Sequence, residues 1–235
     1  MRLNPFSLAI KAVVCAGLFA GSAYAEPVTL AKLTDVTGGS PASTAVFKAS
    51  LSSVSFGTLL SIGISDNSGG LGGAAGEFSG FDLDAIKLSY TDCSTAACAA
   101  TAVAAVAFDF AGGVFFTPGV QRAPTDPKLF GTDASGTAVD NAVATLGLFD
   151  ADSSTVTPDG FLSMGDNGQI SFNLTSGVAT AGLFLYIGEV GDNGEAAAGT
   201  ITVRDTPVGV PEPGTLALAG LALAGLGLVR GRKTC

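Results

Sequence analysis

The chain has 235 residues, which suits one domain with peripheral segments, and its 20 acidic and 11 basic residues give a net charge of −9. Such a surface repels phosphate backbones, so the composition argues against nucleic-acid binding. The sequence contains no histidine, which excludes Ser-His-Asp and Cys-His catalysis and His-ligated zinc sites.

Residues 1–25 have the features of a secretory signal peptide. Arg2 and Lys11 make the start basic, and residues 12–20 (AVVCAGLFA) form an apolar stretch too short to span a bilayer. The tripeptide Ala23-Tyr24-Ala25 has the small-x-small pattern that signal peptidase cleaves. We therefore predict an exported protein, processed by signal peptidase, whose mature chain begins at Glu26.

Residues 26–205 are predicted to form an all-β extracellular domain, a single antiparallel β-sandwich or a jelly-roll-like fold. Apolar side chains alternate with small or polar ones in several short runs, which is typical of half-buried strands. No long amphipathic helix is evident, although residues 140–148 are suited to one or two helical turns. The predicted strands cover residues 53–64, 81–90, 106–110, 170–174, 183–187 and 201–203.

Two of these runs carry further information. Residues 183–187 (LFLYI) are apolar at every position, which predicts a central strand covered on both faces. In the run 81–90 the alternation changes phase at Ala85, which indicates a β-bulge. Before the bulge, Asp82 and Asp84 share one face at roughly 6.6 Å, near the separation of glycosidase carboxylates. The same alternation is typical of a solvated strand face, which is the interpretation we favour, and we expect no enzyme activity.

Turn-rich stretches separate the predicted strands at residues 66–73, 165–168 and 191–194. The first is DNSGGLGG, and the other two are both GDNG. Asn and Gly tolerate positive φ angles, so we interpret these stretches as turns that close β-hairpins.

Cys93 and Cys98 are the two cysteines expected in the exported domain. Cys15 would leave with the signal peptide, and Cys235 lies beyond the C-terminal apolar run. In an oxidising compartment a pair this close in sequence predicts a disulfide, and we expect it to pin the tip of a hairpin. A metal or redox role is disfavoured, because the C-x₄-C spacing comes without partner ligands.

Asp150, Asp152 and Asp159 are candidate calcium ligands. Asp150, Asp152 and Ser154 match the first ligand positions of an EF-hand loop, but a threonine replaces the required glycine and a phenylalanine the bidentate glutamate. An EF-hand is therefore excluded. A looser oxygen cage remains open beside the simpler interpretation of solvated loop carboxylates, and we predict no obligatory cofactor.

The chain is predicted to end in a membrane-spanning segment that follows a linker at residues 206–210. Residues 216–229 are apolar without a charge and would cover roughly 20 Å as a helix. Nothing follows for this helix to pack on, and basic residues at its end orient it with the body of the chain outside. The flanking residues are Pro211, Glu212 and Pro213 before the helix and Arg230, Arg232 and Lys233 after it.

This order of elements, over residues 211–235, resembles the PEP-CTERM sorting signal of Gram-negative bacteria. The resemblance implies recognition by an exosortase, a membrane transpeptidase-like enzyme. An inner-membrane-anchored precursor would then be released to the cell surface or to the exopolysaccharide matrix of a biofilm. The same segment is also labelled an ice-binding protein C-terminal domain, but a sorting signal carries no ice-facing surface and does not imply ice binding.

Two functional hypotheses remain for the predicted domain. Between the two processed ends the chain has six basic and 19 acidic residues, a net charge of −13, which keeps an exported protein soluble. The first hypothesis is a non-catalytic structural or adhesive protein of the surface or exopolysaccharide matrix. The alternative is a carbohydrate-binding module, with calcium assistance as one form of it. The absence of tryptophan weakens this alternative, because sugar platforms favour Trp and Tyr.

Overall fold

The computed structural model describes residues 23–67, 70, 74–154, 156–193 and 200–209. Most of the predicted signal peptide, the predicted helix at 216–229 and the six predicted sorting residues lie outside this part of the chain. Among the residues that are described, no helix is long and apolar enough to cross a membrane. Residues Tyr24–Val208 form one compact unit, which we call the β body.

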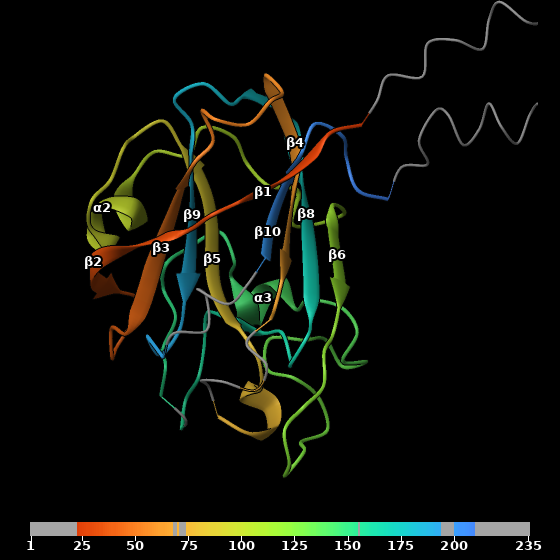
Figure 1. The fold of residues 1–235 in the computed structure, drawn as a ribbon. Helices are drawn as coiled ribbons and strands as arrows, with labels where there is room; N and C mark the ends of the chain where they lie inside the picture. The colour runs from red at the N-terminus through yellow and green to blue at the C-terminus, as the bar shows by residue number, and fades with distance from the viewer. Residues whose placement is uncertain (1–22, 68–69, 71–73, 155, 194–199, 210–235) are drawn as a thin grey trace, which may run out of the picture. The chain divides into compact units, whose positions relative to one another are not determined.

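Two antiparallel sheets make up the described part of the β body, which confirms the all-β prediction and gives a sandwich-like architecture (Figure 1). Sheet A contains, in spatial order, β1 (Ala25–Val28), β10 (Thr200–Arg204), β4 (Thr58–Ser65), β8 (Gln169–Ala179) and β6 (Val114–Thr117). Sheet B contains β2 (Ala31–Thr37), β3 (Thr44–Ser50), β9 (Phe184–Glu189), β5 (Asp82–Ser89) and β7 (Leu162–Ser163). The helical elements are short: η1 (Gly76–Phe78), α2 (Ala96–Thr101) and α3 (Asn141–Ala144).

The main core lies between the two sheets. Ile62 of β4 and Phe172 of β8 are fully buried, and they belong to the same apolar cluster as Leu83 of β5 and Ile187 of β9. Alternate residues of each strand enter this cluster, as period-two patterning requires. Burying one such side chain contributes roughly 1.5–3 kcal/mol, so this cluster supplies much of the driving force for folding.

The outer face of sheet B carries a second apolar cluster, which confirms the prediction for residues 183–187. β9 is the middle strand of sheet B. Its Leu185 and Ile187 enter the main core, whereas Tyr186 faces the other way and packs with Ala96 and Ala99 of α2. Figure 1 shows α2 lying outside β3 and β9. Both faces of β9 are therefore covered, and residues 183–187 are apolar at every position.

The predicted disulfide joins Cys93 and Cys98, but it does not pin a hairpin tip. Residues after Thr95 form α2, and the Thr95 hydroxyl accepts a hydrogen bond from Cys98 N at 3.2 Å as the N-cap. At the other end, the Lys87 ammonium donates to Ala99 O and Ala100 O at 3.1 and 2.6 Å. The run of alanines favours a helix here, a preference that cysteine spacing alone does not show.

The strand boundaries follow the prediction only in part. The bulge at Ala85 is confirmed by a register shift between Leu83 and Ile86 in the β5–β9 pairing. The strand predicted at 53–64 begins only at Thr58, and a register shift between Leu59 and Ser61 marks a bulge that the sequence analysis did not predict. The strand predicted at 106–110 is reduced to one bridge, Phe108 with Leu174.

The first and last strands of the β body pair with each other, an arrangement that the sequence did not reveal. β1 runs antiparallel to β10, with Ala25 opposite Arg204 and Val28 opposite Ile201. In Figure 1, β1 and β2 form an almost continuous ribbon that passes from sheet A to sheet B. The point where the chain enters the β body therefore lies beside the point where it leaves.

Candidate functional site

The described parts of the three turn-rich stretches lie at one end of the β body, and the strands that flank each stretch belong to different sheets. Residues 66–73 lead from β4 in sheet A to β5 in sheet B, and residues 165–168 lead from β7 back to β8. Residues 191–194 follow β9 and precede β10, again in different sheets. Because Ser65 pairs with both Gln169 and Thr200, these crossings share one end. The hairpin prediction was wrong, because Gly and Asn mark a tight turn without showing which strands it joins.

Glycines at this end allow the backbones of neighbouring connections to touch. Gly80 has a φ of +76°, and a Cβ there would lie 2.2 Å from the carbonyl carbon of Gly165. The same contact includes hydrogen bonds from Gly165 N to Ser79 O and from Gly119 N to Met164 O, both at 2.8 Å. These glycines are thus required by close packing as well as by their φ angles.

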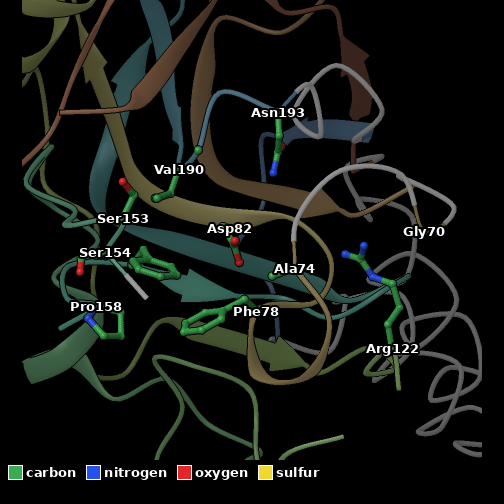
Figure 2. A pocket seen from close by; sticks show the side chains of 12 residues that line it. Gly70, Ala74, Phe78, Asp82, Arg122, Ser153, Ser154, Pro158, Val190 and Asn193 are labelled. Carbon is green, nitrogen blue, oxygen red and sulfur yellow. The ribbon is translucent and has the colours of Figure 1, made fainter. Parts of the chain in front are cut away.

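A cavity of about 640 Å³ opens among these connections, within the size range of small-molecule sites. In the view of Figure 2, Phe78 and Asp82 lie centrally, with Ser153, Ser154 and Pro158 to one side and Arg122 to the other. Backbone and side chains from several connections complete the lining, namely Gly70, Ala74, Phe161, Val190, Gly191 and Asn193.

Aromatic rings form the apolar part of the lining. Phe78 is the last residue of η1 and is half-buried, whereas Phe161 lies just before β7 and is buried. Their ring centroids are 6.0 Å apart, and Phe130 contacts both, at 5.5 Å from Phe78 and 4.5 Å from Phe161. The three rings support one another, which fixes the ring face that Phe78 offers to the cavity.

Asp82 supplies a carboxylate at the first position of β5. It is only 6% exposed and accepts a hydrogen bond from the Ser163 hydroxyl on β7. Its own carbonyl accepts a hydrogen bond from Val190 N at 3.0 Å, which ties together two connections that line the cavity. The carboxylate is thus held in place by sheet B.

Asp84 is completely buried on the same strand, so the interpretation of Asp82 and Asp84 as a solvated strand face was wrong. The segment around Phe149 covers the outer face of β5, and Asp84 accepts hydrogen bonds from the N–H groups of Asp150 and Ala151, both at 3.3 Å. Burial raises the pKa of Asp84 to about 7. The two carboxylates therefore serve different contacts, Asp82 with Ser163 and Asp84 with the N–H groups of Asp150 and Ala151.

Arg122 is positioned through its backbone. Its N–H donates to the Ser79 hydroxyl at 2.8 Å, and its carbonyl accepts from Gly76 N at 2.9 Å, on the flank of η1. The guanidinium forms an ion pair with Asp166, with Nε 3.3 Å from a carboxylate oxygen. The cavity is thus lined by a guanidinium that an ion pair with Asp166 and backbone hydrogen bonds hold in place.

The calcium candidates lie on the loop that also carries Ser153, Ser154 and Pro158. Asp152 and Asp159 are joined through their backbones, by hydrogen bonds of 2.9 and 3.3 Å. The carboxylate of Asp152 accepts from Ser154 N, and that of Asp150 accepts from the Thr145 hydroxyl. Across the described ranges no three acidic or cysteine side chains gather in a way that could hold a metal ion. The loop brings Asp152 and Asp159 together, but not the three carboxylates.

The resulting cavity combines an aromatic face with polar groups that donate and accept hydrogen bonds. Such a lining fits a polar molecule that also has an apolar face. Sequence reasoning missed Phe78, Arg122 and Asn193 as site residues. Asn193 lies within the turn-rich stretch 191–194 and Phe78 closely follows the stretch 66–73, so those stretches could have located both residues. Arg122 is distant in sequence from all three stretches, and no sequence signal marks it.

Comparison with known proteins bears on the C-terminal end of the chain. Residues 209–233 match the family model of the PEP-CTERM protein-sorting motif, which confirms the resemblance seen in the sequence. The description of that model contains no reference to ice binding. No curated protein and no solved structure matches the chain. The matched segment begins directly after Val208, the last residue of the β body.

Proposed function

We propose that this chain, which carries a PEP-CTERM sorting motif at residues 209–233, is an exported protein of the cell surface or the exopolysaccharide matrix. Its β body acts without catalysis, as a structural or adhesive component. An exosortase is its processing partner, and the inner membrane holds the precursor only transiently. The observation that carries this proposal is the sorting motif placed directly after a compact, acidic β body.

Replacing Pro211-Glu212-Pro213 by three alanines tests the proposal in a host that has an exosortase. The two prolines fix φ and supply no N–H, so they hold Glu212 in an extended segment suited to a protease-like cleft. The wild-type chain should appear shortened at the surface or in the matrix, without Arg230 to Cys235. The triple-alanine variant should accumulate at full length in the inner membrane, and deletion of the exosortase should have the same effect. Wild-type protein that retains its C-terminal peptide by mass spectrometry contradicts the proposal.

A second candidate function, carbohydrate binding, is favoured by the cavity at the end of the β body. Sugars present a C–H face that packs on aromatic rings and hydroxyl groups that bond to charged and amide side chains. The cavity offers the Phe78 ring together with Asp82, Arg122 and Asn193. Phenylalanine here takes the place of the tryptophan that the chain lacks.

Binding of the mature protein to a glycan array and to the host's own exopolysaccharide tests this second function. Phe78→Ala should abolish binding while the melting temperature confirms that the variant is folded. Phe115→Ala is the matched control, because Phe115 is 41% exposed on β6 and does not line this cavity. Repeating the measurement with a chelator separates calcium-assisted from calcium-independent binding. If the wild type binds no glycan, carbohydrate binding fails and the sorting proposal is unaffected.

A further inference from the structure

After β10 the chain turns back across the outer face of sheet A, and we call this segment, Asp205–Val208, the C-terminal strap. Asp205 N donates to Tyr24 O at 3.2 Å, but Tyr24 lies before the predicted signal peptidase site, so the mature chain keeps only the contacts that follow. Thr206 O then accepts a hydrogen bond from the buried hydroxyl of Ser61 on β4, at 2.7 Å. Val208 reaches Asn173 on β8, the next strand of sheet A. The strap therefore crosses the strands that follow β10 in the sheet.

The end of the strap is held by the Asn173 side chain. Its amide oxygen accepts from Val208 N at 2.7 Å, and its amide nitrogen donates to Val208 O at 3.1 Å. This two-bond arrangement reproduces the way a neighbouring peptide group would pair. Asn173 is itself fixed by its backbone, which accepts from Asp109 N at 2.9 Å and donates to Gly113 O at 2.8 Å. A rigid side chain thus clamps a single residue at the end of the β body.

The surface beneath the strap is made of small residues. A Cβ at Gly63 would lie 2.9 Å from the Arg204 guanidinium and 3.1 Å from the Ser171 hydroxyl. The Arg204 guanidinium therefore lies against Gly63 of β4, where a larger residue would displace it. This packing also accounts for the Asn-Leu-Thr triplet at 173–175, since Asn173 forms the clamp and Thr175 donates to Ala107 O at 3.1 Å.

The clamp leaves a very short tether before the sorting motif. Only Gly209 and Val210 separate Val208 from Pro211, so the covalent chain limits the distance from Val208 to Pro211 to roughly 10 Å. If the strap detaches as far back as Arg204, the extended chain from Arg204 to Pro211 has a maximum length of roughly 25 Å. An enzyme cleft that binds an extended peptide has walls on both sides of that peptide. A folded β body held within roughly 10 Å of the peptide would collide with these walls.

We infer that the C-terminal strap restrains access of the processing enzyme to Pro211-Glu212-Pro213, and that the Asn173–Val208 clamp opens before cleavage. The inference rests on the proposed sorting function and adds that the strap limits the rate of cleavage by the processing enzyme. Opening the clamp exchanges two hydrogen bonds to Asn173 for bonds to water, without disturbing either sheet. The strap is thus a part of the β body that can be released while the rest stays folded.

Pulse-chase labelling of the full chain in its exosortase-containing host measures the rate of shortening. Asn173→Ala removes the clamp, and a Gly-Ser-Gly-Ser insertion between Gly209 and Val210 lengthens the tether with the clamp intact. Asn173→Ala should accelerate shortening at least roughly fivefold, the change in opening expected for each of the two hydrogen bonds that it removes. The insertion should accelerate shortening as well, without the loss of a hydrogen bond. The two changes combined should give no further gain over the insertion, because spacing no longer limits the rate. Asn141→Ala is the matched control, since it removes a 2.7 Å amide hydrogen bond to Phe110 O away from the strap.

Each outcome decides the inference. Equal rates for the wild type and the insertion variant overturn it, as does slower shortening of Asn173→Ala, which would make the strap a recognition element. If Asn173→Ala fails to fold, the insertion variant decides alone, because it keeps every contact of the β body. A wild-type chain that is never shortened removes the proposed function as well, whereas shortening at equal rates removes only the strap inference.

Discussion

Asp84 on β5 holds Ala151 by a hydrogen bond from Ala151 N to its buried carboxylate, at 3.3 Å. The N–H of Asp150 donates to the same oxygen, so one side chain fastens a whole connection to the outer face of sheet B. The carboxylate is completely buried, and burial raises its pKa to about 7. The Asp84 carboxyl group therefore changes its charge within the physiological pH range.

The stability of the β body should depend on the protonation of Asp84. The folded-state pKa lies above the ordinary value of 3.8, so between these values the folded state binds a proton that the unfolded state lacks. The contribution of Asp84 to stability is fully present below about pH 4 and is lost as the pH rises through about 7. Its slope is at most about 1.4 kcal/mol per pH unit.

Asp84→Asn should remove this dependence, because it keeps an acceptor oxygen but cannot ionise. Urea unfolding from pH 4.5 to 8.5 should show the variant gaining stability relative to the wild type as the pH rises. Asp35→Asn serves as control, since Asp35 is exposed on β2, and it should leave the profile unchanged. Parallel profiles for the wild type and Asp84→Asn contradict the prediction.

Tyr186→Phe should destabilise the β body by about 1–3 kcal/mol. The buried Tyr186 hydroxyl donates to Thr91 O at 2.6 Å and accepts from Cys93 N at 2.9 Å, so its loss leaves two backbone groups without a partner. Tyr90→Phe is a matched change, because Tyr90 is 51% exposed and its hydroxyl bonds only to Ala179 O among the described residues. Denaturant midpoints should move for the first variant and stay nearly constant for the second.

Gly80→Ala and Gly182→Ala distinguish two reasons why a position requires glycine, namely a positive φ angle and close packing against another backbone. Both residues have a positive φ, +76° and +71°, so each substitution costs roughly 1–2 kcal/mol of backbone strain. Gly182 has open space around the added Cβ, whereas at Gly80 the Cβ would overlap the backbone of Gly165. We expect Gly80→Ala to cost considerably more and to impair folding. Equal melting temperatures for the two variants show that close packing is unimportant at Gly80.

The Cys93–Cys98 disulfide closes a short loop, so its removal should have a modest effect. On the chain-entropy model the double Cys→Ser variant loses about 2 kcal/mol and remains folded. Thiol titration of protein isolated from the periplasm should detect no free thiol until a reductant is added. Two reactive thiols in the untreated protein rule out the disulfide in the exported form.

Sequence reasoning succeeded where one strand determines its own pattern. The run at 183–187 is apolar throughout because both faces of β9 are covered, and the phase change at Ala85 marks the bulge of β5. Sequence reasoning failed where the burial or the secondary structure of a segment depends on a segment that is distant in sequence. Asp84 looks solvated until the segment around Phe149 covers it, and α2 depends on packing against Tyr186.

The candidate site was harder to predict than the fold. Its residues come from connections that are far apart in sequence and meet only because the sheets place them at one end. The sorting motif is the opposite case, because it is a contiguous segment with its elements in a fixed order. A motif made of contiguous residues can be recognised in the sequence, whereas a cavity assembled from distant segments cannot.

The pairing of β1 with β10 has a consequence for how the chain folds during export. β10 lies between β1 and β4, so sheet A stays incomplete until the last strand has crossed the membrane. Contacts this distant in sequence form late, and a partly exported chain cannot close its first strand. Any chain truncated before Thr200 lacks the strand that joins β1 to β4 and also lacks the sorting motif. Under the proposed function, truncated chains that lack the sorting motif therefore also lack a complete sheet A, which favours their degradation by proteases.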